Sequence, residues 1–181
     1  LADRYQIPVM LISDLLFSEH SETLENLDPK KISIDRGSWT DPKAKEFKRY
    51  LDTPSGVSPR AKPGMQEPFV FTASSDEHDE RGHLVSDVAT NPVIRQQMMH
   101  KRMRKMDSLA KEMPPDVVIG PPDAELSLIV WGSSFSLAHA LVERGRREGC
   151  SINAMVIRSV WPMHKEKVAQ FISNAKKTLL I

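Results

Sequence analysis

Apolar and polar positions follow a regular pattern in the C-terminal half of the chain, and this pattern predicts alternating strands and helices. Apolar runs at residues 126–132, 152–157 and 178–181 are typical of buried strands. Between them, apolar residues recur every three or four positions at 135–148 and 162–175, which indicates two amphipathic helices. A strand-helix order repeated with short loops predicts a parallel sheet with right-handed crossovers.

A long helix is predicted ahead of this sheet. Pro92 stands at the helix start, with Thr90 and Asn91 before it as candidate caps. Apolar and long side chains then recur at the helical interval as far as Met113, where two prolines end the pattern. A short strand is predicted directly afterwards, over residues 116–120.

Residues 28–91 show no sustained period. They hold six of the 13 prolines, at positions 29, 42, 54, 59, 63 and 68, so no long helix is expected. A short helix around 43–49 and a short strand at 69–72 are the elements predicted here. A loop of this length is unusual inside one domain, so we interpret the segment as a connector that is ordered mainly by neighbouring subunits.

The N-terminal residues resemble a fragment of an α/β unit. Residues 9–12 form an apolar run that predicts a strand buried on both faces, although nothing nearby would pair with it. Ser13 and Asp14 are candidate caps for a helix that begins at Leu15. Because the chain opens with Leu1 and closes on an apolar run, we expect it to be a segment of a longer polypeptide.

Composition narrows the function classes. The 25 Lys and Arg residues nearly balance the 24 Asp and Glu residues, so no global basic field would hold a nucleic acid or an anionic membrane. The apolar runs are far shorter than the ~20 residues that span a bilayer. Cys150 is the single cysteine, which excludes an internal disulfide or a cysteine-held iron–sulfur cluster and suits a cytoplasmic protein.

The densest polar cluster lies at residues 76–83, where carboxylates alternate with His78 and His83. Its histidines lack the spacing of a zinc-binding helix, so we expect no metal. Two other interpretations stay open. The segment either orders its surroundings from a buried or interface position, or forms a plain exposed loop.

The turn after the strongest strand is the second candidate site. Gly132 followed by Ser133 and Ser134, at a strand end before a helix, has the form of an anion- or ligand-binding loop. The alternative is a tight turn whose serines cap the helix. His139, on that helix, is expected to be partly buried and hydrogen-bonded rather than catalytic.

A basic run at residues 100–105 does not indicate nucleic-acid binding, because its charges would spread around a helix. The interleaved methionines favour packing against a partner surface. We interpret Cys150 as an inert thiol, since no base stands beside it in the sequence.

Six motifs, taken in order, resemble the 2-oxoacid:ferredoxin oxidoreductases, and specifically the α subunit of the 2-oxoglutarate type. They span most of the chain and lie at residues 5–14, 34–37, 56–64, 76–83, 99–105 and 128–134.

The resemblance implies a domain plan for the chain. Residues 1–27 would be the C-terminal remnant of the thiamine diphosphate pyrimidine-binding domain, residues 28–91 an irregular connector and residues 92–114 a long helix. Residues 115–181 would be an α/β domain similar to the C-terminal domain of transketolase. The fold class expected is therefore α/β, a three-layer parallel sheet with an extended N-terminal connector.

The resemblance also implies where the chemistry lies. Thiamine diphosphate, magnesium and the iron–sulfur cluster would belong to other parts of the complex, and the β subunit, ferredoxin and coenzyme A would be its partners. No catalytic, cofactor-binding or metal residue is carried over onto this segment, which is expected to be inactive alone. Two alternatives stay open: a small-ligand-binding α/β module that uses the Gly132 loop, and a component of another thiamine-dependent enzyme, such as a transketolase or a 2-oxoacid dehydrogenase.

Overall fold

The computed structural model describes residues 1–25, 28–71, 73, 76–85 and 91–181. The chain divides into two compact units. Unit 1 comprises Leu1–Met10 and Asp28–Leu109, and unit 2 comprises Leu11–Leu27 and Ala110–Ile181. None of the helices in the described part of the chain is long and apolar enough to cross a membrane.

Unit 2 contains a four-stranded sheet in the order β1-β3-β2-β4. Strands β2, β3 and β4 are parallel, as the sequence predicts, with Leu128 opposite both Ala154 and Leu179. Strand β1 lies at the edge and runs antiparallel to β3, a direction that the apolar pattern did not specify. The elements of the unit are α2 (Leu15–Glu19), β1 (Val117–Ile119), β2 (Leu126–Trp131), α4 (Ser134–Arg147), β3 (Ile152–Ile157), α5 (Lys165–Ser173) and β4 (Lys177–Leu180).

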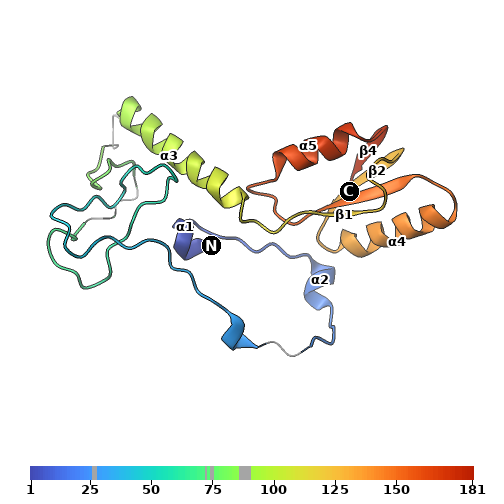
Figure 1. Ribbon diagram of the computed structural model, residues 1–181, viewed down its shortest axis with the longest axis horizontal. Coiled ribbons are helices and arrows are strands. Elements are labelled where there is room, and N and C mark those ends of the chain that lie inside the picture. Colours follow the sequence, from blue (N-terminus) through green and yellow to red (C-terminus); the bar gives the residue numbers. More distant parts are fainter. Residues whose placement is uncertain (26–27, 72, 74–75, 86–90) are drawn as a thin grey trace. The chain divides into compact units, whose positions relative to one another are not determined.

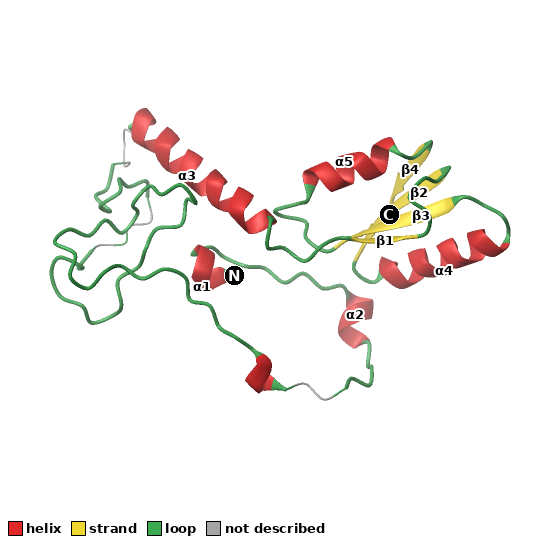
Figure 2. Ribbon diagram, viewed as in Figure 1, coloured by secondary structure: helices red, strands yellow, loops and turns green. Residues whose placement is uncertain are grey.

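The two longer helices of unit 2 cover opposite faces of the sheet (Figure 2). On one face, Ala138 and Val142 of α4 pack with Val130 of β2 and the neighbouring β3 residues. On the other, Phe171 of α5 packs with Ile129 and Met155, which alternate with the first set along their strands. The predicted three-layer α/β fold is confirmed.

A polar pair lies inside the same sheet. The Ser127 hydroxyl donates to Asn153 Oδ1 at 2.5 Å, and Asn153 Nδ2 donates to the carbonyl of Pro121 at 2.8 Å. Both side chains are almost completely buried, at 1% exposure. Asn153 therefore ties β3 to β2 and to the loop between β1 and β2, and each bond satisfies a polar group that water does not reach.

Unit 1 is built on α3 (Pro92–Ala110), which confirms the predicted long helix. Asn91 caps it by accepting from the amides of Val93 and Ile94, at 3.1 and 3.3 Å. The second predicted cap, Thr90, lies outside the described residues. The unit also holds α1 (Ala2–Tyr5) and a single 3₁₀ turn (Pro29–Lys31), and its remaining described residues are loops (Figure 1).

Two predicted elements of the connector are wrong. Residues 43–49 form no helix, because Asp41 turns the chain by accepting from the Lys43 amide at 2.9 Å, a local bond that competes with helix formation. Residues 69–71 form no strand, since no strand in the described part of the chain pairs with them, and Thr72 lies outside the described residues. Phe69 is buried instead, with its ring centroid 5.7 Å from that of Phe47.

The connector packs on its own helix. Gly56, with φ +75°, lies so close to α3 that an added Cβ would sit 2.3 Å from the Lys101 carbonyl oxygen and 2.9 Å from the Lys105 amide nitrogen. Only glycine allows this approach. Part of the segment is thus held against the chain's own helix, and the ordering role of neighbouring subunits stays a prediction.

The predicted strand at residues 9–12 is also absent. All four side chains are more than half exposed, and Leu11 reaches 98%. A strand needs a paired neighbour, and the described residues supply none here. The helix predicted after it is confirmed as α2, with the Asp14 carboxylate accepting from the Phe17 amide at 2.8 Å.

We predict that Asn153→Ala destabilises unit 2 by about 1–3 kcal/mol, because it leaves the Ser127 hydroxyl and the Pro121 carbonyl without their buried partner. Urea unfolding in a Trp39→Phe background, followed by the fluorescence of Trp131 and Trp161, measures the loss. Asn174→Ala is the matched control, since this exposed amide lies at the end of α5. Equal midpoints for the two variants would contradict the prediction.

Candidate functional site

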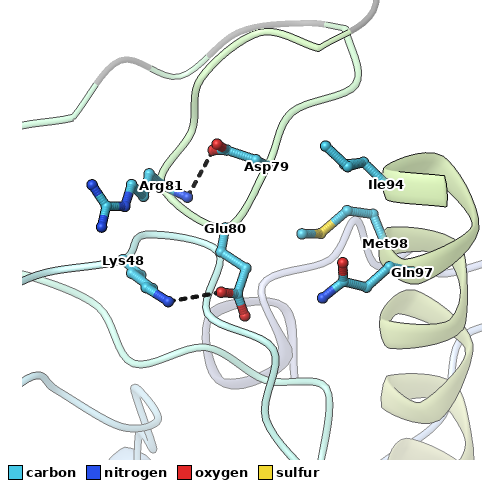
Figure 3. Close-up of a pocket in the computed structure, with 7 residues that line it drawn as sticks. All are labelled: Lys48, Asp79, Glu80, Arg81, Ile94, Gln97 and Met98. Atoms are coloured by element: carbon cyan, nitrogen blue, oxygen red, sulfur yellow. Dashed lines mark hydrogen bonds and ion pairs between the residues drawn. The ribbon is translucent and has the colours of Figure 1, made fainter. Parts of the chain in front are cut away.

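The acidic segment 76–83 belongs to unit 1 and is folded by its own carboxylates. Asp79 Oδ1 accepts from the amides of Arg81, Gly82 and His83, at 2.9, 3.0 and 2.9 Å (Figure 3 shows the first of these bonds). Burial works to raise the pKa of the Asp79 carboxyl, but these amides outweigh it and lower that pKa. This carboxylate builds a turn.

Glu80 connects the segment to the connector. It accepts from Lys48 Nζ at 2.9 Å and from the Asp52 amide at 2.8 Å. The Asp52 amide and then the Lys48 ammonium lower the pKa of the Glu80 carboxyl. Beside it, the His78 ring stacks on that of Tyr50, with their centroids 3.6 Å apart.

Glu77 connects the segment to α3. Its carboxylate receives both guanidinium branches of Arg102, at 2.6 and 3.1 Å, in a bidentate pair. Glu77 is only 7% exposed, whereas the Arg102 side chain is 44% exposed. Burial works to raise the pKa of Glu77, but the hydrogen bonds and charge of Arg102 prevail and hold it below the ordinary value.

These contacts decide between the interpretations of the segment. Three of the four carboxylates, those of Glu77, Asp79 and Glu80, are engaged, and Glu77 is buried, so the plain exposed loop is wrong and the ordering role agrees with the structure. Across the residues that the structure describes, no three His, Cys, Asp or Glu side chains are grouped so as to hold a metal ion. The absence of a bound metal stays a prediction.

A small cavity opens between the segment and α3. It measures about 190 Å³, below the roughly 300 Å³ at which ligand pockets usually begin. Its wall combines paired charges on the loop side with α3 side chains that face them (Figure 3). The residues that line it are Lys48, Asp79, Glu80, Arg81, Ile94, Gln97 and Met98.

In unit 2, the loop after β2 is occupied by a carboxylate of the chain. Asp14 Oδ2 accepts from the Ser133 amide at 2.9 Å, and Ser133 makes no side-chain cap of its own. Gly132 has φ +57°, and an added Cβ would lie 2.8 Å from Asp14 Oδ2. The predicted serine cap is therefore wrong at Ser133, because Asp14 serves the start of α4 as well as that of α2.

The same geometry tests whether the chain fits a thiamine diphosphate pyrophosphate. The donor that such an anion would need at the Gly132 loop already faces a carboxylate of like charge. No metal-binding group lies among the described residues either. These residues do not fit the cofactor, and no catalytic step through it is derived for this segment.

Three other sequence interpretations have clear outcomes. His139 is exposed, so the expectation of a partly buried histidine is wrong; its ring lies 6.2 Å from that of Phe135. The charges of the basic run lie on several faces of α3, as expected, and the face that carries Lys101 and Lys105 is buried. Cys150 is a free, exposed thiol, and its inertness stays a prediction.

A second hollow lies along the exposed side of α4 and measures about 540 Å³. Its charges come from Arg144, Arg147 and Glu148, and Arg144 Nε already donates to Glu148 at 2.8 Å. It offers no nucleophile and no acid-base pair.

The comparisons with known proteins agree with these findings. No family model matches the sequence. The α subunit of 2-oxoacid:ferredoxin oxidoreductase 2 from Aeropyrum pernix is 30% identical over 99% of the chain, which covers 28% of that protein. The α subunit of oxidoreductase 1 from the same organism is 32% identical over 96% of the chain and 27% of its own length. The 2-oxoglutarate synthase subunit KorA of Methanothermobacter marburgensis is 25% identical over the whole chain and 46% of its own length.

Among solved structures, the 2-oxoglutarate:ferredoxin oxidoreductase from Magnetococcus marinus matches 99% of the chain with a TM-score of 0.87 and 27% identity. The resemblance to 2-oxoacid:ferredoxin oxidoreductase α subunits is confirmed. The chain spans less than a third of the length of the first α subunits that it matches, at 28% of each. It covers 30% of the matching Magnetococcus marinus chain.

Sequence reasoning found the 76–83 cluster but missed the partners that give it a role. Arg102 lies 25 positions from Glu77, and Ser133 lies 119 positions from Asp14. The excess of cations in the helix that follows the acidic segment was the available signal for the contact between Glu77 and Arg102. No local feature of the sequence indicated the contact between Asp14 and Ser133.

We predict that Glu77→Gln lowers the stability of unit 1 by about 1–2 kcal/mol at pH 7, because it removes the charge from a buried bidentate pair. The folded pKa of Glu77 lies below its usual value of 4.5, so this contribution is complete above that pH and is lost as pH falls toward the folded pKa. The difference in the free energy of unfolding between wild type and Glu77→Gln should become smaller as the pH falls over that range. Urea unfolding followed by Trp39, in a Trp131→Phe, Trp161→Phe background, measures it.

The matched control for that experiment is Glu46→Gln. Glu46 pairs with Arg81 at 2.8 Å, but both side chains are about 60% exposed, so its removal should cost no more than ~0.5 kcal/mol. A Glu77 effect equal to that of Glu46, or one that stays constant from neutral to acidic pH, would contradict the prediction.

Proposed function

We propose that this chain is part of the α subunit of a 2-oxoacid:ferredoxin oxidoreductase. Such an enzyme decarboxylates a 2-oxoacid, transfers the acyl group to coenzyme A and passes the electrons to ferredoxin. The proposal is carried by one observation: the structural similarity to the Magnetococcus marinus enzyme extends over 99% of the chain at a TM-score of 0.87. A shared α/β domain alone would not reproduce unit 1 as well.

The substrate that we propose is 2-oxoglutarate. The KorA relatives are subunits of 2-oxoglutarate synthases, and the Magnetococcus marinus structure contains 2-oxoglutarate, coenzyme A and succinyl-CoA. The relatives from Aeropyrum pernix and Sulfurisphaera tokodaii are named only for a 2-oxoacid, which supports the reaction class, so the assay has to identify the acid.

We further propose that the segment is structural. Its domain plan would be the remnant of a pyrimidine-binding domain (1–27), a connector (28–91), a helix (92–114) and an α/β domain (115–181). The exposed apolar side chains of Leu11, Leu15 and Leu16 support the first assignment, because a completed domain would cover them.

The catalytic apparatus would then lie outside this chain. Thiamine diphosphate, magnesium and the iron–sulfur cluster would be held by other regions and by a β subunit in the cytoplasm. The described residues would have a structural role. Glu77 and Glu80 hold the connector in place, and Asp14 holds the turn before α4.

The small-ligand module is the weaker alternative. It relies on free backbone donors at the Gly132 loop, and the Ser133 amide there is bonded to Asp14. A dissolved anion would have to displace a carboxylate that the chain itself holds in place.

The test is reduction of ferredoxin or methyl viologen that depends on 2-oxoglutarate, with coenzyme A, thiamine diphosphate and magnesium supplied. We expect turnover from the full-length α subunit together with its β subunit, and none from the 181-residue chain alone or with the β subunit. Pyruvate and 2-oxobutyrate, assayed in parallel, test the substrate.

The outcomes separate the parts of the proposal. Turnover with pyruvate but not 2-oxoglutarate would reject the substrate and keep the reaction class. Turnover by the 181-residue chain above a heat-treated control would reject the structural role. No turnover by a folded, cofactor-loaded full-length complex with any 2-oxoacid would reject the proposed function itself.

A further inference from the structure

Helix α3 directs two lysines into the interior of unit 1. Lys101 is 6% exposed and Lys105 is 9% exposed, although lysine is rarely buried unless it is paired. Among the described residues, no carboxylate forms an ion pair with either ammonium group. Lys105 Nζ reaches only the neutral backbone oxygen of Gln6, at 3.5 Å.

A third cation lies beside the two lysines. Arg49 Nη1 donates to Gln6 Oε1 at 2.7 Å, so Arg49 and Lys105 contact the same residue. The Arg49 guanidinium also lies over the rings of Tyr50 and Phe71, at 5.0 and 5.4 Å. The hydrogen-bonding and stacking partners of Arg49 among the described residues are thus uncharged.

The three groups repel one another. Burial, followed by the charge of Lys105, lowers the pKa of Lys101 to about 8. Burial, followed by the charge of Arg49, lowers the pKa of Lys105. The protein therefore holds like charges together in a place that disfavours each of them.

Two carboxylates in the described part of this region are paired with other cations. Asp52 pairs with Arg104, and Glu77 pairs with Arg102. Asp52 does favour the charged form of Lys101, but its contribution is smaller than those of burial and of Lys105. The positive charge of the Arg49, Lys101 and Lys105 cluster is left uncompensated by the described residues.

The two lysines keep a small exposed fraction, 6% for Lys101 and 9% for Lys105. Among the described residues, none hydrogen-bonds to the Lys101 ammonium group, so this donor is available to a small ion.

We propose that Arg49, Lys101 and Lys105 form a binding site for a small oxyanion of the phosphate class. A phosphate group carries about −1.5 to −2 charges and several acceptor oxygens, so it compensates three cations better than one carboxylate can. The bidentate geometry of Arg49 suits such an anion. This site does not depend on the proposed enzymatic function.

Calorimetric titration of the chain with inorganic phosphate, in a low-chloride buffer of constant ionic strength, tests the site. We expect saturable binding by wild type and a roughly 10-fold or greater loss of affinity in Lys101→Met and in Lys105→Met, since each variant removes a charge-assisted hydrogen bond. Arg95→Met is the matched control, because Arg95 is an exposed cation on the same helix. Its affinity should stay within about twofold of wild type.

A second measurement needs no variant. Phosphate should slow the acetylation of Lys101 and Lys105 by acetic anhydride, read by mass spectrometry, and should leave the exposed Lys111 unaffected. The site would be overturned if the folded chain bound no phosphate, or if Lys101→Met bound it as tightly as wild type. It would also be overturned if Arg95→Met lost as much affinity as the lysine variants, or if phosphate left the acetylation rates of Lys101 and Lys105 unchanged.

Discussion

Unit 1 depends on one constraint: its long irregular segment has only isolated β-bridges in place of a ladder, so side chains must satisfy many of its backbone groups. Buried amides and carbonyls without partners are costly, and a connector with neither strands nor long helices leaves many of them. Asp79 accepts hydrogen bonds from three backbone amides, and Glu80 accepts one from the Asp52 amide. Glu77 connects the segment to Arg102 of α3. The acidic segment therefore functions as a folding element, and the small cavity beside it is a consequence of that packing.

Unit 2 solves the same problem in the opposite way. Its parallel strands satisfy one another, and two helices bury the apolar faces of the sheet, as around Val130 and Phe171. The buried polar side chains of Ser127 and Asn153 are hydrogen-bonded to each other, and Asn153 also donates to the carbonyl of Pro121. The carboxylate of Asp14 acts at the end of β2, where the turn before α4 leaves the Ser133 amide without a partner in the sheet.

This contrast explains how far the sequence could predict the structure. The three parallel strands and their helices were predictable, because burial on a regular element leaves a period in the sequence. The strands expected at residues 9–12 and 69–72 failed over their described residues, because an apolar run forms a strand only where a partner strand exists, and pairing is not local. At the candidate site, the carboxylates of 76–83 were visible, but their roles were set by residues such as Lys48 and Arg102, 32 and 25 positions away.

Helix α3 shows the limit of such reasoning most clearly. Methionines on a basic helix favour an apolar packed face and a solvated charged one, yet Met99 and Met103 are 42% and 45% exposed while Lys101 and Lys105 are buried. A helix that buries ammonium groups must recover their lost hydration from other charges or dipoles. Gln6, with its two neutral oxygens, supplies part of that compensation to Lys105 and Arg49. The remaining charge requires a counter-ion from outside the described residues, so α3 serves as the scaffold of unit 1 and also as the wall of an anion site.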